Sequence, residues 1–174
     1  DFSAQIIVRH STLVPGVQCD PTGQPRFPGT PSIMIAPGNA AESVRLQLSH
    51  SICGPIRADF CAVSACDSII DAPLRASLAV TAYSANFSRV TVIGQCQIVR
   101  VDAIKDSVLM DLLIVMDRSS STFAVTYSVL PYDPTLGPIT YRCQPFLSVN
   151  EAASPDEKRR LADVLRPQLA ASRF

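Results

Sequence analysis

Alternation of apolar and polar residues through residues 74–130 restricts the fold of this chain more than any other feature. The clearest case is Thr122–Leu130, where every second residue from Phe123 to Val129 is apolar and the positions between them hold Ala, Thr and Ser. A period of two residues is that of a strand with one buried face. We therefore expect an all-β protein.

Further strands are expected where the same alternation recurs between turn-forming residues. The expected strands are Ala4–Val8, Ser32–Ala36, Ser43–Ser49, Ile56–Val63, Pro73–Tyr83, Phe87–Val101, Val108–Met116, Thr122–Leu130 and Ile139–Val149. A turn at 84–86 would separate two of them, and Gly94 would bend the longer one. Val108–Met116 also fits a helix, but we favour a strand because all its even-numbered residues are apolar.

These segments favour a two-sheet antiparallel β-sandwich, because there are about eight or nine of them at irregular spacing and we find no internal repeat. We expect an eight-stranded jelly roll, with an immunoglobulin-like sandwich as the second choice, since the chain has no Trp.

The chain divides into three regions by composition. Residues 1–31 are rich in Pro and Gly and predict an extended N-terminal arm. Residues 32–150 would form the sandwich, and residues 151–174 a helix and tail. Ser154 as cap, Pro155 at the first helical position and Glu157 as partner of the cap predict where that helix begins.

Composition excludes some functions. The 174 residues carry no net charge, which argues against a surface built to neutralise phosphates. No window approaches the roughly 20 apolar residues of a membrane-spanning helix. Contact with nucleic acid is therefore not indicated, and no membrane span is expected.

Six cysteines leave the redox compartment open. They are Cys19, Cys53, Cys61, Cys66, Cys96 and Cys143. An even number permits three disulfides, but free buried thiols are equally good core material.

No residues predict a catalytic, cofactor or metal site. His50 and Cys53, followed by Cys61 and Cys66, are the nearest approach to a zinc set, and their spacing is unlike that of known zinc motifs. Nucleophile elbows, phosphate loops and dinucleotide-binding glycine patterns are lacking. Asp111 and Asp117 would lie too far apart on one strand for a glycosidase pair. We therefore expect a protein that is not an enzyme and holds no cofactor.

Asn86 begins a glycosylation sequon, placed by the expected strands at a turn tip. The sequon and the start at Asp1 are compatible with secretion or with release from a precursor.

Two functions follow from these expectations. The first is a structural, self-assembling subunit that contacts other copies or related subunits through its N-terminal arm and its sheet edges. The Pro-rich arm, the strand count and the lack of an active site resemble small non-enveloped virus coat subunits, a resemblance that implies a capsid protein located in the virion. The second is a secreted or cell-surface binding or adhesion domain stabilised by disulfides.

Overall fold

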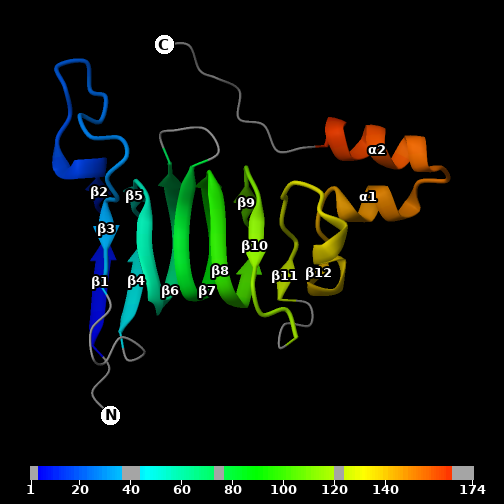
Figure 1. Ribbon diagram of the computed structural model, residues 1–174, viewed down its shortest axis with the longest axis horizontal. Helices are drawn as coiled ribbons and strands as arrows, with labels where there is room; N and C mark the ends of the chain where they lie inside the picture. Colours follow the sequence, from blue (N-terminus) through cyan, green and yellow to red (C-terminus); the bar gives the residue numbers. More distant parts are fainter. Residues whose placement is uncertain (1–3, 37–43, 73–76, 120–123, 166–174) are drawn as a thin grey trace.

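The computed structural model shows a β-solenoid, in which the chain winds through about five turns and every strand pair is parallel (Figure 1). It describes residues 4–36, 44–72, 77–119 and 124–165. The strands are β1 (Gln5–Arg9), β2 (Thr12–Leu13), β3 (Ile33–Met34), β4 (Arg45–Ser49), β5 (Ile52–Cys53), β6 (Ile56–Asp71), β7 (Leu78–Ile93), β8 (Gln95–Lys105), β9 (Val108–Leu109), β10 (Leu113–Val115), β11 (Val125–Thr126) and β12 (Thr140–Tyr141). The helical segments are η1 (Pro15–Val17), η3 (Pro134–Ile139), α1 (Phe146–Glu151) and α2 (Pro155–Val164).

Three parallel ladders form the sides of the solenoid. The first runs β1, β4, β6, β7, β8, β11 and β12. The second joins β2, β5, the end of β6, the end of β7 and β9. The third joins β3, the starts of β6, β7 and β8, and β10. The long strands therefore bend around corners: β6 and β7 each contribute to all three sides, and β8 contributes to two.

The core is a stack of aliphatic side chains along the solenoid axis. On the first ladder Leu46 pairs in register with Val63, and Val63 with Ala85. All three are at most 1% exposed. Phe87 is the largest fully buried side chain. Because each turn packs mainly on the turns before and after it, stability is close to a sum of neighbouring contacts.

Non-glycine residues with positive φ form the corner between the first and second ladders. They are His10, His50, Asp67, Arg89, Asp106, Tyr127 and Arg142, with φ between 48° and 55°. This left-handed conformation turns the chain sharply and costs about 1 kcal/mol or more at each non-glycine residue.

A ladder of serine hydroxyls stabilises this corner (its members are Ser11, Ser51, Ser68, Ser107 and Ser128, each just after a corner residue). Each hydroxyl donates to the carbonyl two residues before it, as Ser107 Oγ does to Lys105 O at 2.6 Å. Three of them also accept a backbone N–H from the corner of the preceding turn, as Ser128 Oγ does from Ser107 N at 3.1 Å. Ser107 Oγ accepts from Val90 N in the same way. The ladder thus satisfies polar groups that the turn would leave buried and unpaired.

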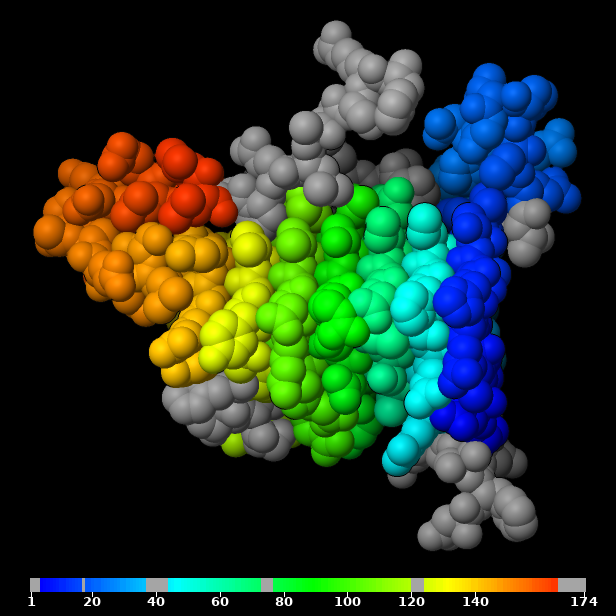
Figure 2. Space-filling model, turned by 180° about the vertical axis from the view of Figure 1, so that it is seen from behind, coloured from blue at the N-terminus to red at the C-terminus, as the bar shows by residue number. Residues whose placement is uncertain are grey.

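The two ends of the solenoid differ. At the C-terminal end η3 and α1 contribute the buried side chains Leu136, Ile139, Phe146 and Val149. At the N-terminal end β1 is the outermost of the described strands of its ladder and, among them, pairs only with β4. Figure 2 shows β1 as a blue outer edge, at the opposite end from the orange helices.

The antiparallel sandwich and its jelly-roll topology were wrong predictions. Alternation identifies a half-buried strand but carries no information on the direction of its partner. Here every strand pairs with the equivalent segment one turn away, which gives parallel pairing throughout. The jelly-roll strand count was one of the features behind the interpretation as a virion capsid, and the structure does not support that interpretation.

Residues assigned to an extended arm supply the first turn of the solenoid. β1 lies in register with β4, from Gln5 opposite Arg45 to Arg9 opposite Ser49. The Pro-rich residues between β2 and β3 form an exposed loop containing η1 and a bridge between Cys19 and Pro25.

Several strand predictions were correct in kind but missed the corners. The turn predicted at 84–86 is absent, because β7 continues through it. Val108–Met116 is extended, as favoured, but its odd-numbered residues face the core on both β9 and β10, so that Leu109, Leu113 and Val115 are buried and Met116 is 58% exposed. In Thr122–Leu130, Thr122 and Phe123 lie outside the described residues; Tyr127 is a corner residue, and it is 55% exposed rather than inside with Val125.

The C-terminal helix was predicted correctly at its start. Ser154 Oγ accepts from Glu157 N at 3.2 Å, and Glu157 Oε2 accepts from Ala153 N at 3.0 Å. Pro155 is the first residue of α2. Ile139–Val149, in contrast, holds only the short strand β12 and then begins α1.

Candidate functional site

The candidate zinc residues point in different directions. His50 is an exposed corner residue and its ring stacks on that of His10, with centroids 4.9 Å apart. Cys53 faces the core, whereas Cys66 is half-buried. Among the residues that the structure describes, no three His, Cys, Asp or Glu side chains come together as a metal-binding group.

Burial makes the core thiols poor nucleophiles. It raises the pKa of Cys53 and of Cys96 to about 12, and it also raises that of Cys143. No disulfide is present in the described part of the chain, so the disulfide-stabilised domain is not the structure observed. The solenoid core takes these side chains as small apolar groups.

The two carboxylates considered for catalysis cap turns instead. Asp111 Oδ1 accepts from Leu112 N, and Asp117 Oδ1 accepts from the backbone and the hydroxyl of Ser119.

The corner carries a charge network. Asp67 accepts two hydrogen bonds from the Arg89 guanidinium, at 2.5 and 2.8 Å. The side-chain hydrogen bonds from Arg89 are the largest cause holding the pKa of Asp67 below its usual range. His50 Nε2 lies 3.8 Å from Asp67 Oδ2. These charged groups are substantially exposed, so their ion pairs add little to the stability of the fold.

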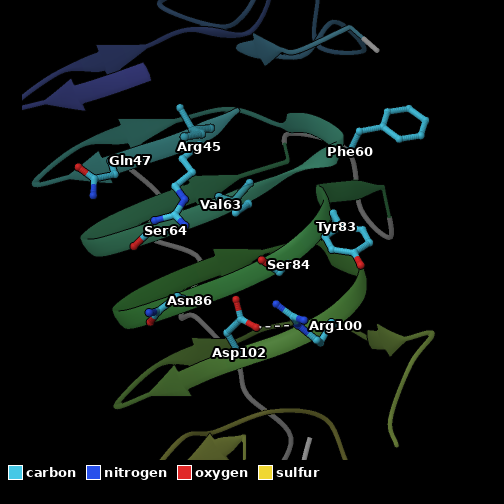
Figure 3. Close-up of a pocket in the computed structure, with 12 residues that line it drawn as sticks. Arg45, Gln47, Phe60, Val63, Ser64, Tyr83, Ser84, Asn86, Arg100 and Asp102 are labelled. Atoms are coloured by element: carbon cyan, nitrogen blue, oxygen red, sulfur yellow. Dashed lines mark hydrogen bonds and ion pairs between the residues drawn. The ribbon is translucent and has the colours of Figure 1, made fainter. Parts of the chain in front are cut away.

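A groove of about 560 Å³ lies on the outward side of the first ladder (Figure 3). Its shape follows from the register of four turns. In one column Arg45 pairs with Ala62, Ala62 with Ser84, and Ser84 with Arg100. Long side chains on the outer two turns thus stand beside small side chains on the middle two. The small residues form the floor and the two arginines form the walls.

Polar and aromatic side chains complete the groove. Figure 3 shows Phe60 and Tyr83 at one end and Gln47 and Asn86 at the other. The rings are exposed at 47% and 45% because they lie at another corner, where the register between β6 and β7 shifts after Ala58.

The groove has a net positive charge, because Arg45 and Arg100 line it with a single carboxylate, that of Asp102. Arg100 Nε donates to Asp102 Oδ1 at 2.8 Å, and its guanidinium lies 6.0 Å from the centroid of the Tyr83 ring. Arg45 has no ion-pair partner within the described ranges. One guanidinium is therefore neutralised and the other is available to an anion.

Asn86 lies on the groove and not at a turn tip. It sits in the middle of β7, with an exposed side chain beside the fully buried Phe87. Sequence reasoning missed the groove because its residues come from four strands and become neighbours only through the register.

The open edge of β1 is the second candidate site. Ala4 O accepts from Arg45 N, and His10 N donates to Ser49 O. In a parallel strand the backbone groups of alternate residues point to the same side. The groups of residues 4, 6, 8 and 10 therefore face β4, and those of Gln5, Ile7 and Arg9 face outward.

Comparison with protein-family models, with curated proteins and with solved structures gives no match. Within the described residues, no helix is both long and apolar enough to cross a membrane. The groove and the β1 edge are therefore interpreted from their own geometry.

Proposed function

We propose that this protein is a non-enzymatic structural subunit that self-assembles by pairing the β1 strands of two copies across a two-fold axis. The observation that carries the proposal is the edge of β1, which is unpaired within the described residues and lies at an end of the solenoid that none of the described helices covers. An unpaired edge of this kind is a template for another strand.

The hydrogen-bonding pattern of the edge fits an antiparallel partner. Antiparallel strands exchange both hydrogen bonds between directly opposed residues, at every second position. With the axis at Ile7, Ile7 opposes its own copy and Gln5 opposes Arg9. These are the residues whose backbone groups face outward. About six main-chain hydrogen bonds would form without disturbing the pairing of β1 with β4.

The side chains of β1 are self-complementary in this register. Ile6 would oppose Val8, and both belong to the inward face because they pair with the buried Leu46 and Leu48. Ile6 is 40% exposed in one copy, so pairing would cover an open end of the core. On the outer face, the two copies of Ile7 would meet at the axis. The side-chain amide of each Gln5 would lie beside Arg9 of the other copy, with groups that both donate and accept hydrogen bonds.

The symmetry of the contact favours a discrete dimer. A two-fold contact uses the same surface on both copies and closes on itself. The opposite end is covered by η3 and α1, whose buried side chains leave no second open core in the described part of the chain. The hydrogen bonds contribute roughly 0.5–1.5 kcal/mol each, and the apolar side chains covered at the contact add to them. Set against the entropy lost on association, these contributions favour a weak dimer, with a dissociation constant of roughly tens of micromolar.

Ile7→Pro tests this arrangement. Proline removes one outward N–H, which the solenoid itself does not use, and proline is tolerated on an edge strand. We expect the unaltered protein to be a dimer and Ile7→Pro a monomer in sedimentation velocity at about 1–200 µM, a range chosen around the expected affinity. Ile7→Val, which keeps the N–H and an apolar side chain, is the matched control and should dimerise.

Both variants are to be compared by circular dichroism, since the proposal requires that Ile7→Pro keep the folded solenoid. Ile7→Lys adds a second check by placing two like charges at the axis. A parent protein that stays monomeric throughout this range, or folded Pro and Lys variants that dimerise as the parent does, would show that the β1 edge is not the contact.

A further inference from the structure

We propose that the groove on the first ladder binds an oligosaccharide that carries carboxylate groups, as in a chain of uronic acids. The groove lies on the outward side of the second to fifth turns, so this site is separate from the β1 edge. Its volume, about 560 Å³, is within the range of small-ligand sites.

The groove side chains match the chemistry of a sugar. Exposed rings such as Phe60 and Tyr83 offer flat apolar faces against which the C–H face of a sugar ring can pack. Gln47, Asn86 and Ser64 supply amide and hydroxyl groups, which both donate and accept, as sugar hydroxyls do. The aromatic and amide ends are separated by about 10 Å along the strand, from Tyr83 to Asn86 at about 3.3 Å per residue. That distance favours more than one sugar unit.

The charges favour an acidic sugar. Arg45 and Arg100 form opposite walls, and within the described residues only Arg100 is paired with a groove carboxylate, that of Asp102. A guanidinium presents two parallel N–H groups to a carboxylate, which makes Arg45 a specific partner for a uronate.

Other polymers fit less well. An extended peptide gains affinity by pairing with a free sheet edge, whereas the backbone groups under the groove are used by the ladders. A nucleic acid requires several cations for its phosphates, and this groove offers two arginines against one carboxylate.

Calorimetric titration tests the proposal with the full chain, produced without glycosylation so that Asn86 is unmodified. The probes are a hexamer of galacturonic acid, a neutral glucose hexamer and a poly-glutamate peptide of similar charge. We expect saturable binding of the uronate hexamer. We expect at least tenfold weaker binding of the glucose hexamer, which lacks a carboxylate to pair with Arg45, and of the peptide, which lacks sugar rings to pack against Phe60 and Tyr83.

Matched variants localise the site. Arg45→Gln and Tyr83→Ala should each weaken uronate binding about tenfold or more. Arg142→Gln and Tyr141→Ala make the same changes on exposed residues outside the groove and should stay within about twofold of the parent. Circular dichroism verifies that each variant is folded, and amide shift changes on titration should centre on β6 and β7.

Three results would overturn the inference. The first is no uronate binding at millimolar concentrations. The second is binding that Arg45→Gln and Tyr83→Ala leave unchanged. The third is peptide or neutral-sugar binding as tight as that of the uronate hexamer.

Discussion

Replacing Ser107 by Ala tests whether the serine ladder holds the solenoid corners. Ser107 is 2% exposed. Its hydroxyl accepts from Val90 N at 3.1 Å and donates to Lys105 O at 2.6 Å. Alanine removes both hydrogen bonds while leaving the backbone N–H of Val90 buried, because Val90 is only 1% exposed.

The expected loss of stability is about 2 kcal/mol. A buried donor left without its partner costs roughly 1–3 kcal/mol. The Lys105 carbonyl adds little, since it lies beside the exposed corner residue Asp106 and water can replace the hydroxyl.

The first turn provides a matched control. Ser11 Oγ donates to Arg9 O at 2.8 Å, but no backbone N–H donates to it within the described residues, which hold no earlier turn of the ladder. Ser11→Ala therefore leaves no orphaned donor, and we expect a loss of only about 0.5 kcal/mol. The two variants differ in the hydrogen bond from a preceding corner and in burial, because Ser11 is half-buried whereas Ser107 is buried.

Equilibrium urea unfolding, followed by far-ultraviolet circular dichroism at one protein concentration, measures both effects. The comparison requires that the slope m be unchanged, because repeat proteins can lose cooperativity. If Ser107→Ala loses no more stability than Ser11→Ala, the ladder does not satisfy the corner groups as argued.

Three further predictions follow from the same contacts. Burial raises the pKa of Cys96 to about 12, so in the native protein at pH 8 this thiol should not react with a maleimide, whereas the exposed Cys19 should; equal labelling rates by mass spectrometry would contradict this. Hydrogen bonds from Arg89 lower the pKa of Asp67 below 3.8. The ionised Asp67 therefore contributes its full share of folding stability above pH 3.8, and that share is lost as the pH falls through the lower native pKa. Asp67→Asn should reduce the dependence of the free energy of urea unfolding on acid pH. Gly94 has φ 114° and an added Cβ would lie 2.7 Å from a backbone carbonyl oxygen, so Gly94→Ala should lower stability by about 2 kcal/mol or more in thermal unfolding, and an unchanged midpoint would refute the strain.

Local structure was predictable from local residues. Leu46 and Leu48 alternate with polar neighbours and are buried on β4 as expected. The start of α2 follows from Ser154 and Glu157, because a capping box needs only residues a few positions apart. Gly94 was expected to mark a bend, and it lies between β7 and β8.

The arrangement of these segments was not predictable from alternation alone. A left-handed corner residue exchanges inward and outward positions, so Tyr127 points outward although it shares a period of two with Val125. The groove was likewise out of reach, because Ala62 and Ser84 become its floor only when their strands lie side by side in register.

A repeated signal for the corners was nevertheless present in the sequence. His, Asp or Tyr followed by Ser, then a β-branched residue, then Leu, Ile or Cys occurs at Ser11, Ser51, Ser68, Ser107 and Ser128. Each feature has a physical reason: the first residue tolerates positive φ, the hydroxyl binds the freed carbonyl, and the β-branched residue begins the next strand. The repeat is irregular, because the segments between its copies differ in length and Val90 replaces the serine in one turn. A search for a fixed period therefore does not find it.

The same ladder explains why the N-terminal end matters for assembly. In a solenoid each turn satisfies the backbone and covers the core of its neighbour, so a terminal turn needs a cap or a partner. At the C-terminal end the stack ends in side chains such as Phe146, which is 4% exposed and packs near Tyr132. At the other end, within the described residues, Ser11 Oγ receives no backbone donor, β1 has one unpaired side and Ile6 is partly exposed. A second copy, paired through β1, supplies in one contact both the hydrogen bonds and the apolar cover that a further turn would provide.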